Sequence, residues 1–246
     1  MQLIVKAEER TLELKAKALA KDLNLEFQSS QKIHKTSIKN KNAYYLIKGK
    51  DMLYLQKGLT RKSNPIFCNF LEWSNASYGN SLIKCMRGLP KDCSVVDATA
   101  GFGRDALSLA TISGSVLLIE RLPWMIALLE DAIESVQHKS LRNLIGKFNL
   151  ISGDSKDYLL NNHTRVDVIY LDPMFPNTGN AKAKKNIQAL RDLTKEDNSS
   201  SLFFIAMELA SSRVIVKRHK NSIFINNLKP NFSISGKTVR FDVYKT

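Results

Sequence analysis

Short apolar runs alternate with amphipathic segments over the larger part of the chain. Residues 93–98, 115–120, 148–154 and 166–172 have the length and composition of buried strands, and the segments 103–112, 123–137 and 155–161 between them have helical spacing. Pro123 suits the first turn of its helix, where a missing N–H costs nothing. Alternating strands and helices predict a mostly parallel sheet with helices on both faces.

The two ends of the chain extend this pattern. Residues 199–210 predict a helix, residues 213–217 a strand, and residues 232–244 an antiparallel hairpin of edge strands around Gly236. Near the N-terminus, a short strand precedes an amphipathic helix, and residues 43–58 predict two strands joined by a turn at Gly49–Asp51. The expected fold is therefore α/β with a small N-terminal α+β appendage, divided into residues 1–91 and 92–246.

The distribution of charge changes this picture. The chain has 37 Lys and Arg against 23 Asp and Glu, and residues 1–91 hold 17 basic and 7 acidic residues. Such an excess favours a polyanionic partner, above all nucleic acid, because each neutralised phosphate releases condensed counterions. A well-solvated surface is the alternative interpretation.

Other features of the composition narrow the class of protein. No apolar run is long enough to span a bilayer, and the N-terminus lacks the pattern of a secretory signal. The three cysteines form no C-x-x-C pair, and the four histidines have no metal-ligand spacing. We expect a cytoplasmic protein with reduced thiols, no bound metal and no membrane contact. The sequence indicates no oligomeric state.

Polar residues follow each strand of the predicted sheet, at the edge where ligands bind in open α/β folds. The first strand ends at Asp97, and the chain then turns through Gly101 and Gly103, which allow a close backbone approach to a ligand. The second strand ends in a carboxylate placed to accept both hydroxyls of a ribose, and the third in polar side chains suited to an adenine edge. The further candidate residues are Arg104, Asp105, Glu120, Arg121, Asp154 and Ser155.

The glycine loop also fits the G-x-G-x-x-A pattern of nicotinamide enzymes, from Gly101 to Ala106. However, the carboxylate of Asp97, four positions before Gly101, would repel a pyrophosphate and attract the ammonium of a methionine moiety. S-adenosylmethionine, with S-adenosylhomocysteine as its product, therefore fits better than a dinucleotide. A glycine turn without any ligand is the remaining alternative for this loop.

The stretch YLDPMFP, residues 170–176, follows the fourth strand. It is close to the [Asp/Asn]-Pro-Pro-aromatic signature of methyltransferases that act on exocyclic amino groups, although Met174 replaces the second proline. Asp172 and the Pro173 carbonyl would accept the two amino hydrogens, and Phe175 would stack on the target base. A strand-ending turn with a packed Phe is the alternative.

The stretches VVDATAGFGRDAL, ER at 120–121, VIYLDPMFP, RVIVKR and RFDVY resemble the RsmJ type of small-subunit ribosomal RNA (guanine-N2) methyltransferase over about residues 53–244. The resemblance implies a class I, Rossmann-like methyltransferase fold and methylation of a guanosine near the 3′ end of 16S rRNA, free or in the small ribosomal subunit. It also implies a set of cofactor residues: Arg104, Asp105, Glu120, Arg121, Asp154, Ser155 and Asp172. Two segments depart from the family, at residues 74–88 and 180–200, and both affect the expected placement of the substrate.

The sequence leaves the roles of two basic clusters undecided, and it also allows other functions. Lys182, Lys184 and Lys185, and Lys217, Arg218 and Lys220, would contact phosphates or lie on a solvated face. The chemistry of Asp-Pro-x-aromatic also suits adenine N6 or a protein glutamine. A non-catalytic RNA-binding protein on a methyltransferase fold is the alternative from another class.

Overall fold

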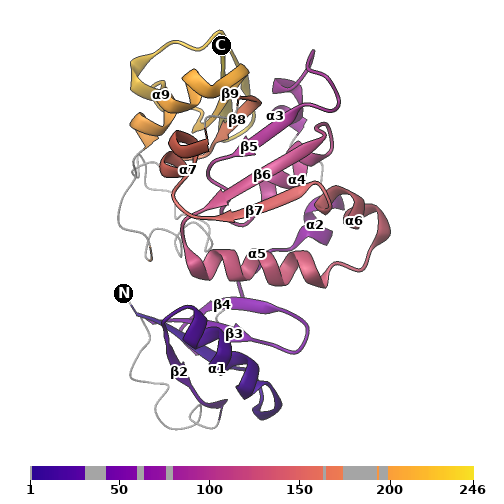
Figure 1. The fold of residues 1–246 in the computed structure, drawn as a ribbon, viewed down its shortest axis with the longest axis vertical. Helices are drawn as coiled ribbons and strands as arrows, with labels where there is room; N and C mark the ends of the chain where they lie inside the picture. Colours follow the sequence, from indigo (N-terminus) through magenta and orange to yellow (C-terminus); the bar gives the residue numbers. More distant parts are fainter. Residues whose placement is uncertain are drawn as a thin grey trace. The chain divides into compact units, whose positions relative to one another are not determined.

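The computed structural model of the chain describes residues 2–30, 43–59, 64–75, 80–162, 165–173, 193 and 199–246. The described residues form two compact units. The first contains the residues up to Cys68 together with Ala127–Ser135 and Leu193, and the second contains the other described residues from Asn69 onward. Helix α5 (Pro123–Ser135) contributes to both units, and Figure 1 shows the elements of each.

The first unit is a four-stranded sheet in the order β2-β1-β3-β4. Strand β1 is parallel to β2 and β3, while β3 and β4 form the predicted antiparallel hairpin. The elements are β1 (Leu3–Ala7), a 3-10 turn (Arg10–Leu12), α1 (Glu13–Asp22), β2 (Glu26–Gln28), β3 (Tyr44–Lys48) and β4 (Leu53–Lys57). The predicted N-terminal strand, helix and hairpin are thus all present.

Asp131 of α5 holds the hairpin of the first unit. Its carboxylate accepts hydrogen bonds from the backbone N–H of Leu53, at 2.6 Å, and from the ammonium of Lys48. Lys6 of β1 is buried and donates from Nζ to the Ser29 carbonyl at 2.9 Å, and burial lowers its pKa. These polar contacts satisfy groups that the strands bury.

The second unit is a seven-stranded sheet in the order β10-β11-β9-β8-β5-β6-β7. All neighbouring strands are parallel except β11, which is antiparallel to both β9 and β10. The strands are β5 (Ser94–Asp97), β6 (Ser115–Glu120), β7 (Phe148–Ser152), β8 (Val166–Leu171), β9 (Ala210–His219), β10 (Phe232–Ser235) and β11 (Val239–Lys245).

Helices cover both faces of this sheet, as the alternating pattern predicts. Ile169 and Leu171 of β8 pack in one core cluster with Phe203 of α9 and Leu159 of α7, whereas Tyr170 between them reaches α4. Successive side chains of a strand point to opposite faces, so α4 lies across the sheet from α7 and α9. The helices are α2 (Phe70–Asn75), α3 (Asn80–Cys85), α4 (Arg104–Ala110), α6 (Lys139–Ile145), α7 (Ser155–Asn162), α9 (Ser199–Leu209) and a 3-10 turn (Ile225–Asn227).

The C-terminal hairpin is confirmed, but only one of its strands is at an edge. Strand β11 lies between β9 and β10, so β10 forms one edge of the sheet, while β7 forms the other. The turn contains Gly236, whose N–H donates to the Val239 carbonyl at 2.7 Å. No helix among the described residues has the length and apolar character needed to cross a membrane.

The compact units divide near residue 68, whereas the sequence suggests a functional division after residue 91. Helices α2 and α3 belong to the sheet unit and contact α4. A distinct role for residues 1–91 in contacting RNA stays a prediction.

Candidate active site

The glycine loop between β5 and α4 has the backbone conformation that its glycines allow. Gly101 has φ of +52° and Gly103 has φ of +75°, in the left-handed region where other residues are strained. The Gly101 N–H donates to Oε2 of Glu120 at 2.9 Å. The loop is therefore tied to the end of the neighbouring strand β6.

Glu120 ends β6 and is buried. Its second oxygen, Oε1, accepts the N–H of Leu122 at 2.9 Å, so the carboxylate connects the turn after β6 to the glycine loop. Burial raises the pKa of Glu120, and its backbone hydrogen bonds oppose that rise. The backbone of Arg121 is a third donor to this carboxylate, so three of its four lone pairs are used and one can still accept a ribose hydroxyl.

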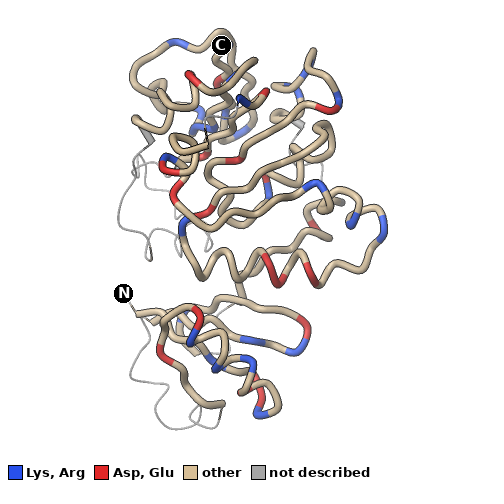
Figure 2. Tube along the Cα trace, in the orientation of Figure 1, with Lys and Arg blue, Asp and Glu red and all other residues tan. Residues whose placement is uncertain are grey.

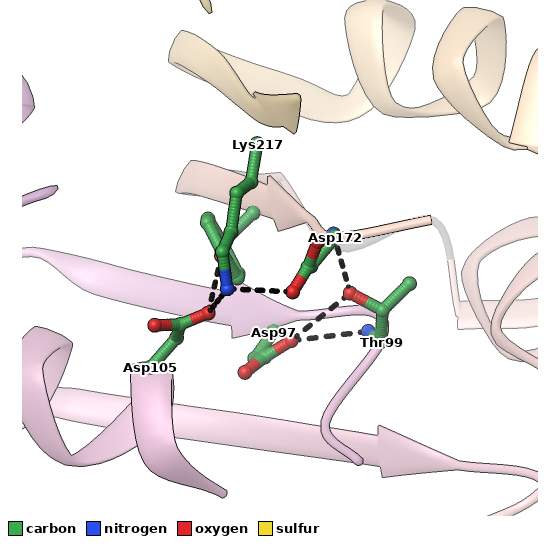
Figure 3. A network of polar contacts seen from close by, with 6 residues as sticks. Asp97, Thr99, Asp105, Asp172 and Lys217 are labelled. Carbon is green, nitrogen blue, oxygen red and sulfur yellow. Dashed lines mark hydrogen bonds and ion pairs between the residues drawn. The ribbon is translucent and has the colours of Figure 1, made fainter. Parts of the chain in front are cut away.

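Asp97, at the end of β5, is almost completely buried beside Thr99. Its Oδ1 accepts from the Thr99 backbone N–H at 3.1 Å and from the Thr99 hydroxyl at 3.5 Å. The same hydroxyl oxygen accepts the N–H of Asp172 at 2.7 Å, which links the ends of β5 and β8 (Figure 3). Burial, with the charges of Asp105 and Asp172, raises the pKa of Asp97 to about 8.

Lys217 connects two further carboxylates at this edge of the sheet. Its Nζ lies 2.6 Å from Oδ2 of Asp105 and 2.7 Å from Oδ2 of Asp172, as Figure 3 shows. The Tyr170 hydroxyl donates to the same Asp105 oxygen at 2.6 Å. Lys217 is thus part of the candidate active site. The sequence had suggested instead that it contacts a phosphate or lies on a solvated face.

The register of the central strands explains this position. Strands β8 and β9 are parallel neighbours, and Leu171 is paired with Val216. Asp172, the first residue after β8, therefore lies beside Lys217, which is still within β9 and pairs with Phe241 of β11. Arg218, the next member of the basic cluster, is buried and donates to the Ile223 carbonyl at 2.8 Å.

The end of β7 is connected to the same edge of the sheet. Asp154 accepts the N–H of Lys156 at 2.9 Å and so caps α7, while the Ser155 hydroxyl donates to the Ala98 carbonyl at 2.6 Å. Ser155 therefore ties the start of α7 to the residue that follows Asp97. The adenine contact predicted for Asp154 and Ser155 remains a prediction.

The other predicted residues are placed less centrally or lie outside the described residues. The Arg104 guanidinium is 5.8 Å from the centre of the Trp73 ring, Arg121 is exposed, and Pro173 is buried. Phe175 and the cluster of Lys182, Lys184 and Lys185 lie outside the described residues.

The sequence assigned no role to Thr99 and Tyr170 of this network, and it suggested Lys217 only as a phosphate contact or part of a solvated face. Lys217 follows the apolar run of its strand directly, so the rule that identified Asp97 and Asp172 at strand ends also applies to it. Tyr170 lies within a continuous apolar run, which gives no signal that its hydroxyl meets Asp105.

The charges of this cluster suit a cationic ligand. Asp97, Asp105 and Asp172 face one ammonium, that of Lys217, so the cluster has an excess of acidic groups. Such a cluster attracts a sulfonium or ammonium group and repels a pyrophosphate. Together with the glycine loop and the strand order, it defines a class I methyltransferase that binds S-adenosylmethionine.

Comparisons with known proteins agree. The family described as "Putative SAM-dependent methyltransferase" matches residues 27–246. Proteins named ribosomal RNA small subunit methyltransferase J are 34% identical in Chromobacterium violaceum, over 82% of this chain and 84% of that protein, and 36% identical in Tolumonas auensis, over 82% and 86%. The chain belongs to the family of SAM-dependent methyltransferases that includes these proteins.

Another relative of the same name, from Nitrosococcus oceani, is 42% identical over 62% of this chain, and the match spans only 62% of that protein's length. A crystal structure of a SAM-dependent methyltransferase from Neisseria gonorrhoeae aligns with a TM-score of 0.68 and 22% identity, over 99% of this chain and 96% of that one. The structural likeness confirms the fold, and the family confirms S-adenosylmethionine as the cofactor.

Proposed function

We propose that the protein transfers a methyl group from S-adenosylmethionine to the exocyclic N2 of a guanosine near the 3′ end of 16S ribosomal RNA. The position of Asp172 is the observation that supports this most directly. It follows β8, next to β5, at the point where the strand order reverses and ligands bind in such sheets. Its side chain is 36% exposed, so a substrate can reach it.

The residues at this point match the needs of an aromatic amino group. S-adenosylmethionine supplies an electrophilic methyl group, but the amino lone pair is delocalised into the base. Acceptors that hold both N–H groups allow the nitrogen to pyramidalise, and we assign these roles to the Asp172 carboxylate and the Pro173 carbonyl. Thr99 fixes the backbone of Asp172 through its N–H.

The transfer requires no strong base in this proposal. The methylated nitrogen is briefly cationic, which makes its proton acidic and easily lost. Phe175 would stack on the base once it is unpaired or flipped out of its helix. The candidate cofactor residues lie at the strand ends and in the glycine loop with the helix that follows it, and they are Asp97, Gly101, Gly103, Arg104, Asp105, Glu120, Arg121, Asp154, Ser155 and Asp172.

We assign contact with the RNA, either free rRNA or the small ribosomal subunit in the cytoplasm, to the basic residues 1–91. Six of their 17 basic residues lie within 31–42 and 60–63. In the described part of this region, basic and acidic residues are interspersed along the strands and α1 (Figure 2). The excess of positive charge therefore depends strongly on those two segments.

The test is methylation of 16S rRNA and of small subunits taken from cells that lack the protein, with labelled S-adenosylmethionine and mass spectrometry of the nucleosides. The expected product is N2-methylguanosine near the 3′ end. Label in N6-methyladenosine or in a protein glutamine would assign the enzyme to another amino group. Binding of cofactor and RNA without transfer would favour a non-catalytic RNA-binding protein.

A further inference from the structure

We propose that Lys217 is a positioning residue: it holds one oxygen of Asp172 and leaves the other directed to the amino group of the target base. This inference rests on the proposed function, since it assigns the amino group to Asp172. It adds a second residue, from a different strand, to the group that orients the acceptor.

The contacts of Asp172 support this role. Its Oδ2 is 2.7 Å from Lys217 Nζ, and its backbone N–H is fixed by Thr99 at 2.7 Å. Among the residues that the structure describes, only Lys217 is hydrogen-bonded to the Asp172 side chain. One oxygen is therefore held from the protein side, and Oδ1 retains both lone pairs for a substrate N–H.

The solvent exposure of the side chains in this network also supports the positioning role of Lys217. The side chains of Lys217 and Asp105 are 14% and 10% exposed, against 36% for Asp172. Lys217 and Asp105 thus form the inner part of the network, and Asp172 is the member that a base can reach. A lysine in this inner position acts on the substrate only through Asp172.

The neighbouring charges give Lys217 a second effect on Asp172. The groups that face this carboxyl are Asp97 from β5, Asp105 from α4, Lys217 from β9 and the Tyr170 hydroxyl from its own strand. Burial and the charge of Asp105 disfavour an ionised Asp172, and Lys217 opposes them through its charge and its hydrogen bond. A protonated Asp172 has a hydroxyl donor where the amino group needs an acceptor, so loss of the ammonium would impair orientation.

The experiment compares Lys217→Met, which removes donor and charge, with Lys217→Gln, which keeps a donor but no charge. Lys245→Met, at the exposed end of β11, is the matched control. We expect kcat to fall about 10- to 100-fold in Lys217→Met, the scale of a misplaced reacting group, with little change in KM for the RNA. Lys217→Gln should lose less, and the control should behave as wild type.

The pH profile separates this role from a purely structural one. Without Lys217 the pKa of Asp172 rises, so a smaller fraction is ionised at a given pH, and the acidic limb of the kcat profile moves to higher pH. A folded Lys217→Met or Lys217→Gln protein with an unshifted limb and normal kcat would overturn the proposal.

Carbon NMR of labelled aspartate follows the Asp172 carboxyl without any substrate, with Asp172→Asn used to assign its signal. We expect a higher pKa in Lys217→Gln than in wild type, and an equal or lower value would refute the role of Lys217. If wild type transfers no methyl group to RNA while this shift is observed, the proposed substrate is wrong and the effect of Lys217 on Asp172 stands.

Discussion

Two regions of the chain have opposite arrangements of charge. Residues 1–91 contain 17 basic and 7 acidic residues, while the carboxyl edge of the large sheet places Asp97, Asp105 and Asp172 around Lys217. The first arrangement attracts a polyanion, and the second attracts a cation. The two ligands of the proposed reaction are of these two kinds, a phosphate backbone and a sulfonium.

In the proposed reaction, this difference in charge would direct the RNA backbone and the cofactor to different sites. A phosphate near the three carboxylates would be repelled, whereas an uncharged base is not. We therefore expect the base alone to enter the edge of the sheet, with its backbone held elsewhere. This separation makes distinct predictions for salt, for mutations and for pH.

The largest expected effect is that of salt on RNA binding. If about six phosphates are neutralised, affinity should fall on the order of 10³-fold between 50 and 200 mM salt. Replacing Lys32, Lys35, Lys39 and Lys41 by Gln should lower the slope by about 0.7 to 0.9 for each lost contact. Filter binding across a salt series measures both, and an unchanged slope would place the phosphate contacts outside residues 31–42.

Asp172→Asn should reduce methyl transfer by about 100- to 1000-fold, the range for loss of one preorganised electrostatic group in an active site. RNA affinity should be unaffected, since Asp172 is at the acidic edge. Asp157→Asn, on the exposed face of α7, is the control for the same chemical change. Single-turnover transfer and RNA binding are measured on the same protein samples. Equal losses in both would show that the acidic edge of the sheet contributes to RNA binding as well as to methyl transfer.

Glu120→Ala should weaken S-adenosylmethionine by about 1 to 3 kcal/mol, because it removes a charge-assisted acceptor. Glu120→Gln, which keeps one acceptor oxygen, should lose less. Calorimetric titration measures the affinity, and thermal unfolding shows whether the fold survives. Unchanged affinity in a folded Glu120→Ala protein would remove the predicted ribose contact and leave Glu120 as an anchor of the glycine loop.

The smallest effect concerns pH and the cofactor. Because the pKa of Asp97 is raised to about 8, most of this carboxyl is protonated at pH 7. A cationic ligand prefers the ionised form, so the affinity for S-adenosylmethionine should rise by up to about tenfold from pH 6 to pH 7, a range in which the α-ammonium of the cofactor, with a pKa of about 7.7 to 8.0, stays mostly protonated. Asp97→Asn should flatten this dependence. A falling affinity over the same range would show that another group controls binding.

Local patterns predicted most of the elements and most strand ends, but not the short elements β2, α2 and α6. Asp97, Glu120 and Asp172 each follow an apolar run, so their common edge could be inferred before any coordinates. The position of β11 inside the sheet could not, because a hairpin pattern defines which two strands pair but not which of them faces the rest.

The same limit applies inside the site. The pairing of Lys217 with Asp105 and Asp172 depends on the register of β9 against β8, across 45 residues of sequence. The sequence predicted Ser155 as a cofactor residue, whereas in the structure its hydroxyl donates to the backbone carbonyl of Ala98. Composition and spacing identify the polar residues at an edge, but hydrogen-bond partners follow from packing that is not local.

The location of β11 also has a consequence for the order of folding. β10 pairs only with β11, through a tight turn at Gly236, whereas β11 must also reach β9, from which it is separated by residues 220–238. The local hairpin should form early and then dock as a unit, since short loops close at lower entropic cost than long ones. A chain truncated before Val239 would lose β11, leave β10 without its partner strand and expose one edge of the long strand β9, a template for aggregation.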